Sequence, residues 1–132
     1  MRHFTLKELT RSATAQRLGI DNTPPASAVI ALHALVDNVL DPLRDAWGGP
    51  IRVNSGYRCP ELNKAVGGTP TSQHQRGEAA DITVGSRSGN RRLLALIKQL
   101  DLPVDQCIDE KNCRWIHVSH RAGRNRRLYM KF

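Results

Sequence analysis

The sequence has little that would support a disulfide scaffold or a membrane anchor. It contains three cysteines in 132 residues, an odd number, so a reducing compartment is the simpler expectation. The first nine residues mix charged and apolar side chains and lack the apolar run of a secretory signal. No later stretch looks apolar for long enough to cross a bilayer. We therefore expect a chain without a membrane span, made in the cytoplasm without a signal peptide.

Aromatic residues are also scarce, at 5% of the chain, whereas basic residues are abundant. There are 20 Lys and Arg against 12 Asp and Glu, a net charge of +8, and such a surface attracts nucleic acids and anionic cell-wall polymers alike. Several basic residues near the C-terminus fit either a phosphate-binding tail or, more simply, a solvated edge strand: Arg121, Arg124, Arg126, Arg127 and Lys131. Because no aromatic residues alternate with the basic ones, nucleic acid is not the expected partner.

Hydrophobic periodicity predicts one α+β domain over residues 1–132. The Thr5–Glu8 segment has the capping-box pattern that starts a short helix. Apolar residues at three- and four-residue steps predict the longest helix from Val29 to Leu43, whose last turn Pro42 bends or ends early. A second amphipathic helix is predicted over Arg91–Leu100. Two or three helices are thus available to cover a sheet.

The remaining periodic segments are short enough for strands. They are predicted at Ile51–Asn54, Ala79–Val84, Val104–Ile108 and Trp115–Ser119, with a further edge strand at Leu128–Phe132. A polar turn between the third and fourth predicts an antiparallel pair, and together the strands predict a small antiparallel sheet. Between Ser55 and Arg76 lies a long polar loop with one helical turn, and a loop of this length in a small domain is usually functional or disordered.

Three side chains in and after this loop form a candidate metal site. His74 ends the loop, and Asp81 lies in an otherwise apolar strand, where an ionised carboxylate needs a cation, a metal or strong donors. In the Trp115–Ser119 strand, alternation places His117 on the face opposite Ile116 and Val118. Two imidazoles and a carboxylate are a recurring ligand set for catalytic zinc.

The spacing of these residues alone leaves other ligands open. Each histidine taken singly is more often a hydrogen-bonded structural residue than a ligand. Other side chains have suitable chemistry: His3, His33, Cys113 and His120. Cys113 is the main competitor, because it lies in the polar turn just before His117.

Five ordered blocks between Ile51 and Ser119 resemble the zinc D-alanyl-D-alanine carboxypeptidase family, which includes phage endolysins that cut L-alanyl-D-glutamate bonds. The blocks are Ser55-Gly56-Tyr57-Arg58, Asn63 with Val66-Gly67-Gly68, Ser72-Gln73-His74, Gly77-Glu78-Ala79-Ala80-Asp81 and Trp115-Ile116-His117-Val118-Ser119. The N-terminal segments, up to Trp47, are similar to short phage or prophage members. The resemblance implies a fold related to the Hedgehog signalling domain.

Carried over residue by residue, the resemblance implies a zinc peptidase. His74, Asp81 and His117 match the zinc ligands, and Glu110 matches the general base that takes a proton from water. The neighbouring Asp109 would replace Glu110 after a one-residue slip, but the two acids point to opposite faces of a strand. Arg58 matches the arginine that holds a substrate carboxylate or polarises the scissile carbonyl. Ser72 matches a serine lining the same pocket, although it could equally be a cap.

These expectations imply a substrate and a place of action. The partner would be a peptide of peptidoglycan, bound by a monomer that acts on the cell wall after release or delivery. The bond could be that of a carboxypeptidase or of an endopeptidase. Two other functions remain: a non-catalytic wall-binding or tail-associated module of the same fold, and a basic nucleic-acid-binding protein.

Overall fold

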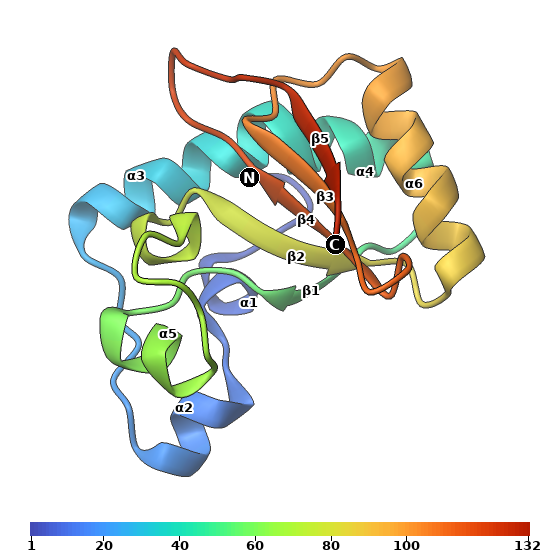
Figure 1. Cartoon of the computed structure of the whole chain (residues 1–132). Helices are drawn as coiled ribbons and strands as arrows, with labels where there is room; N and C mark the ends of the chain where they lie inside the picture. Colours follow the sequence, from blue (N-terminus) through green and yellow to red (C-terminus); the bar gives the residue numbers. More distant parts are fainter.

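A five-stranded sheet organises the protein in the computed structural model, which describes residues 1–132. The strand order is β1-β2-β4-β3-β5 (Figure 1). The strands are β1 (Arg52–Ser55), β2 (Ala79–Thr83), β3 (Gln106–Glu110), β4 (Trp115–Ser119) and β5 (Leu128–Lys131). Neighbouring strands pair antiparallel except for β3 and β5, which pair parallel. The predicted α+β class, the β3–β4 antiparallel pair and the C-terminal edge strand are therefore confirmed.

Helices cover one face of this sheet and leave the other face open. The long helical run α3 (Ala26–Leu35), η1 (Val36–Leu40) and α4 (Asp41–Trp47) lies behind the sheet in Figure 1, and α6 (Arg87–Gln99) packs beside α4 and β4. Alternating strand residues point toward these helices and join one buried cluster: Val53, Ala80, Ile82, Cys107, Ile116 and Val118. Because side chains alternate along a strand, the intervening residues face away from the core.

The longest helix continues through Pro42, so the expectation that this proline ends it early was wrong. Proline has no N–H, and its ring clashes with the carbonyl four residues earlier in a regular α-helix. The helix widens into a π-helical segment just before the proline, where the Asp41 N–H donates to the Val36 carbonyl. Such a π turn absorbs the irregularity, and the helix then runs on to Trp47.

The same run, Ala26–Trp47, bears on the expectation that no stretch is long and apolar enough to cross a bilayer. It is the one helix that is long and apolar enough to cross a membrane, by length and composition alone. The core helix of a globular protein can have the same length and composition, and nearly half of the apolar part of this run is buried inside the protein. Leu32, Leu35, Val39 and Leu43 from this run are fully buried in the core. The helix is therefore weak support for a membrane span.

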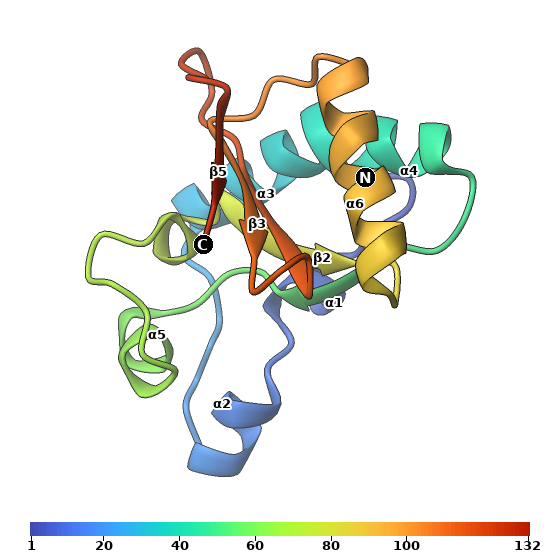
Figure 2. The same ribbon diagram turned by 45° about the vertical axis from the view of Figure 1, so that its right-hand side comes forward.

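Three short helices complete the fold. The capping box predicted at Thr5 and Glu8 is present and begins α1 (Leu6–Thr10). Helix α5 (Pro60–Ala65) is the helical turn predicted in the long loop. Helix α2 (Ala13–Leu18) was not predicted, and it contacts α5 at the end of the molecule away from α6 (Figure 2).

A buried carboxylate ties the long loop to the C-terminal strand. Asp105 is fully buried before β3 and accepts hydrogen bonds from Arg126 through its backbone N–H, Nε and a terminal nitrogen. It also accepts a bond from Gln73 Nε2 at 3.1 Å, in the residue before His74. The Arg126 bond lowers the pKa of Asp105 to about 2 despite the opposing effect of burial. Asp105 therefore fixes the turn that carries His74.

Replacing Asp105 by Asn should lower the free energy of unfolding by about 2 kcal/mol at pH 7, because Arg126 and Gln73 lose a charged acceptor. A carboxyl with a depressed folded-state pKa stabilises above its unfolded pKa, near 4, and loses that effect as the pH falls through about 2. The gap between the two proteins should therefore shrink over this range. Urea unfolding at several pH values measures it. Asp101→Asn, which breaks the exposed Arg127 pair, is the control and should change the free energy of unfolding little. An equal loss of stability in this variant would contradict the role given to Asp105.

Candidate metal centre

Two of the three predicted ligands stand opposite each other on the open face of the sheet. Asp81 in β2 is paired in register with His117 in β4. Their strand neighbours Ile82 and Ile116 point into the core, so alternation turns Asp81 and His117 the other way. His74 comes from η2 (Gln73–Arg76), the 3₁₀ turn that leads into β2. The face predicted for His117 is thus confirmed.

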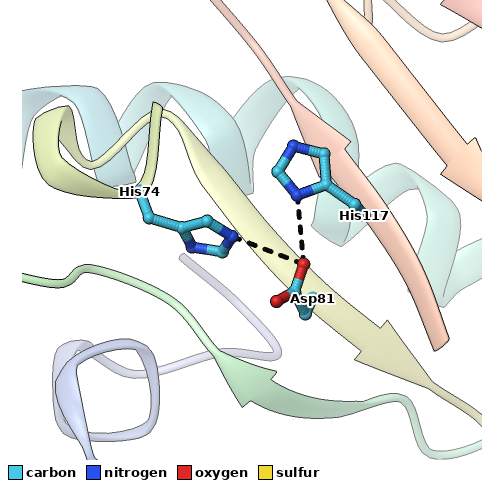
Figure 3. A group of neighbouring side chains, drawn as sticks. All are labelled: His74, Asp81 and His117. Carbon is cyan, nitrogen blue, oxygen red and sulfur yellow. Dashed lines mark hydrogen bonds and ion pairs between the residues drawn. The ribbon is translucent and has the colours of Figure 1, made fainter. Parts of the chain in front are cut away.

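The three side chains converge, as Figure 3 shows. His117 Nδ1 lies 3.1 Å from Asp81 Oδ1, and His74 Nε2 lies 3.4 Å from the same oxygen. One candidate ligand atom from each residue lies within 4.8 Å of the other two. The side chains of His74, Asp81 and His117 are 2%, 16% and 13% exposed. The site therefore lies at the base of a recess rather than on a free surface.

The spacing and chemistry of these donors fit a zinc ion. Zinc binds imidazole nitrogen and carboxylate oxygen at about 2.0–2.2 Å, with tetrahedral geometry preferred. Two donors on such a tetrahedron are about 3.4 Å apart, close to the two nitrogen-to-oxygen distances found here. Three protein donors leave a fourth position for water or substrate, which is the composition of a catalytic rather than a structural zinc site.

A backbone carbonyl orients His74 for this role. His74 Nδ1 lies 2.7 Å from the Gly56 carbonyl oxygen, and it must carry the proton to donate there. In the neutral form of the ring, which is the form that binds a metal, Nε2 is then the lone-pair nitrogen, and it is the one facing Asp81. Gly56 cannot be replaced without movement, because a Cβ atom would collide with the Leu9 carbonyl. The glycine in the Ser-Gly-Tyr-Arg block therefore serves the geometry of the site.

The charge of Asp81 depends on the two histidines. Burial raises the pKa of its carboxyl, but hydrogen bonds from His117 and His74, together with their charges, outweigh burial and hold that pKa below its usual value. The Asp81 carboxyl is thus ionised at neutral pH. An anionic oxygen between two imidazoles is suited to bind a cation.

The predicted base lies in the same cavity as the ligands. A cavity of about 680 Å³ contains His74, Asp81 and His117 and is also lined by Arg58 and Glu110. The Glu110 carboxylate forms no ion pair in the structure. Asp109 points to the other face of β3, where it accepts a hydrogen bond from the Cys113 N–H at 2.6 Å. The alternation that places Glu110 and Asp109 on opposite faces is therefore observed, while the role of Glu110 stays a prediction.

Arg58 brings an unpaired cation into the cavity. Its Nε is buried and has no hydrogen-bond partner, and Arg58 does not form a surface salt bridge. Burial lowers the pKa of Arg58, opposed by the nearby charge of Asp81. Its backbone N–H donates to the His74 carbonyl at 3.1 Å. A partly buried guanidinium with free donors is suited to a carboxylate or carbonyl oxygen of a ligand.

Ser72 lies where it can have both of the roles considered for it, as a cap and as part of the cavity wall. Its hydroxyl accepts a hydrogen bond from the His74 N–H at 3.2 Å and so caps the η2 turn. It also lines the cavity. The capping function is observed, whereas contact with substrate stays a prediction.

The competing ligands lie elsewhere. Cys113 is fully buried in the hydrophobic core, and burial raises the pKa of its thiol, which disfavours the thiolate. His3 pairs with Asp45, and His120 faces the Pro103 carbonyl. His33 is exposed on α3. None of these four joins the three-residue cluster.

Sequence reasoning missed the wall that the C-terminal segment gives to the cavity. Met130, Phe132 and Arg126 line it, as does Gln106 of β3. In the parallel β3–β5 pairing, Met130 lies opposite Ile108, which explains why its side chain faces the site. Alternation within β5 was readable from the sequence, but its partner strand and direction were not.

The sequence is similar to those of known proteins. The sequence model of the family described as Peptidase M15 matches residues 2–119. The zinc D-Ala-D-Ala carboxypeptidase of Streptomyces albus G is 45% identical over 87 residues, which is 64% of this chain and 32% of that relative. The matched part thus spans about a third of the length of the relative.

The purified protein should bind one zinc ion per chain, measured by elemental analysis after dialysis. The zinc content should fall below one ion per chain in each of the variants His74→Ala, Asp81→Ala and His117→Ala, because two donors hold the ion far less well than three. His33→Ala is the matched control and should retain full zinc. Full zinc in any of the three ligand variants would remove that residue from the site.

Proposed function

This chain belongs to the peptidase M15 family, and on that premise we propose that it is a zinc metallopeptidase that hydrolyses a peptide bond in the stem peptides of bacterial peptidoglycan. The convergence of His74, Asp81 and His117 within one cavity carries the proposal. The named activity of the Streptomyces relative supports the substrate class. Zinc bound there would polarise the scissile carbonyl and lower the pKa of water.

Two further side chains of the cavity supply the rest of the chemistry. Glu110, which has no ion-pair partner, accepts a proton from the attacking water and returns it to the leaving amine, as a general base and then a general acid. Arg58 directs its free donors at the substrate and stabilises either the developing negative charge or a terminal carboxylate. Because the ligands lie in a recess, little water surrounds Glu110 and Arg58. Their electrostatic interactions with the reacting groups are stronger for that reason.

The scissile bond is that of a D-Ala-D-Ala carboxypeptidase or an L-Ala-D-Glu endopeptidase. The name of the Streptomyces relative favours the carboxypeptidase, and so does an unpaired arginine able to hold a terminal carboxylate. Mass spectrometry of peptidoglycan digested by the purified protein separates the two. Release of free D-alanine indicates the first, and a stem peptide freed from its L-alanine indicates the second. Bound zinc with no released peptide would instead indicate a non-catalytic wall-binding module.

Replacing Glu110 by Ala should lower kcat by about 10²–10⁴-fold while zinc is retained, because the variant loses proton transfer but no ligand. Asp109→Ala is the matched control, since it removes a neighbouring carboxylate that faces away from the cavity. It should keep most of its turnover and lose some stability, because the Cys113 N–H loses its acceptor. Peptide release and zinc content are measured on both. The opposite pattern would assign the base to Asp109.

Replacing Arg58 by Ala should lower kcat/KM by about 10²–10³-fold, the usual cost of one positioned donor to developing charge. Zinc content should not change, because Arg58 is not a ligand. Arg124→Ala removes an exposed charge outside the cavity and serves as the control. Unchanged kinetics of the Arg58 variant would reject its proposed contact with substrate.

A further inference from the structure

A second cavity of about 570 Å³ adjoins the catalytic one. The two share Arg58 and Val66 in their walls. Arg11, at the end of α1, and Arg52, in edge strand β1, also line the second cavity. Three arginines thus line a space that contains no aspartate or glutamate. Its volume is in the range of cavities that bind small ligands.

These arginines have no partners within the protein. Arg11, Arg52 and Arg58 form no ion pair, and none of their side chains donates a hydrogen bond. The cavity thus differs from the C-terminal segment, where Arg126 is paired with Asp105 and Arg127 with Asp101. Grouped like charges without a counter-charge repel one another, and an anionic ligand relieves that repulsion. The positive charge continues beyond this cavity, because Arg52 also lines a third one with Arg87 and Arg114.

We propose that the second cavity is a subsite in which Arg11 and Arg52 hold a carboxylate of the peptide substrate, beside the cavity in which the bond is cut. This inference rests on the proposed peptidase function and extends it to substrate recognition away from the metal. Guanidinium groups bind carboxylates through charge-assisted hydrogen bonds, often two at once. A stem peptide with a γ-linked D-glutamate offers such a carboxylate.

Two features favour a peptide over an anionic wall polymer as the occupant. The cavity shares Arg58 with the catalytic one, so whatever fills it lies beside the group placed at the metal. Its wall also contains Tyr57, Leu62 and Val66, which suit the apolar parts of peptide side chains. A chain of phosphates would gain nothing from these residues.

The test uses two synthetic pentapeptides that end in D-Ala-D-Ala and differ in one group. One has a γ-linked D-glutamate with a free α-carboxylate, and the other has the α-carboxamide. Binding is measured by calorimetry on the zinc-loaded Glu110→Gln protein, so that neither peptide is consumed. The acid should bind about tenfold more tightly than the amide, the value of one charge-assisted hydrogen bond. Arg11→Ala or Arg52→Ala, added to this protein, should reduce that preference to about twofold or less.

Arg17→Ala removes one positive charge from α2, outside both cavities, and should keep the tenfold preference. An equal fall in this control would show that overall charge, and not a subsite, produces the preference. The proposal would also be overturned if Arg11→Ala and Arg52→Ala both keep the preference for the acid peptide. The same holds if the Glu110→Gln protein shows no preference to begin with. Binding of poly(glycerol phosphate) that depends on Arg11 and Arg52 while the two peptides bind alike would overturn it as well.

Failure of the subsite is separable from failure of the proposed function. Wild-type protein that cleaves both peptides with equal kcat/KM, with equal binding by the Glu110→Gln protein, refutes the subsite and leaves the peptidase intact. Wild-type protein that releases no fragment from either peptide or from peptidoglycan refutes the peptidase. The acid-to-amide binding ratio still decides whether Arg11 and Arg52 recognise a carboxylate in that case.

Discussion

The central constraint on this structure is an ionised carboxylate placed in the middle of a sheet strand. Asp81 has aliphatic neighbours on both sides in β2, and burial of its charge would be costly without strong partners. The two histidines are its partners, and they outweigh the effect of burial on its pKa. A buried charge whose partners are two imidazoles and a cation adds little to the stability of the fold. Its presence in the strand is better explained if Asp81 belongs to a binding site.

The rest of the fold can be understood as the means of bringing the two histidines to that carboxylate. Antiparallel pairing places His117 directly opposite Asp81, so strand register alone fixes one distance. His74 arrives from a loop and needs more support. The Gly56 carbonyl fixes its ring, the Ser72 hydroxyl caps its turn, and Asp105 holds the preceding Gln73. The contacts from Gly56 and Asp105 come from distant parts of the chain, and they hold the end of the long loop in place.

Much of the site was predictable from local patterns, whereas its surroundings were not. Two-residue alternation identified the faces of His117, Glu110 and Asp109, because side-chain direction in a strand depends only on position. His74 was a candidate by its chemistry, and the resemblance to a known family singled it out from the other possible ligands. The π turn before Pro42 and the parallel pairing of β5 depend on tertiary packing, which a single sequence does not encode in any short window. The Asp105–Arg126 contact was missed for the same reason.

What the positive charge of the chain can bind depends on where the basic residues lie in the structure. From composition, a net charge of +8 indicated attraction to polyanions, and the basic C-terminal segment was the obvious place for it. The structure uses part of that segment internally, because Arg126 and Arg127 pair with Asp105 and Asp101. Arg11 and Arg52, which form no ion pair, instead line the cavity beside the catalytic one, at the end of α1 and in β1. Since long-range attraction is screened within about 10 Å at moderate salt, charges beside the cleft act on a bound substrate more than those in the tail. The location of the basic residues, more than their number, therefore determines which anion the protein can recognise.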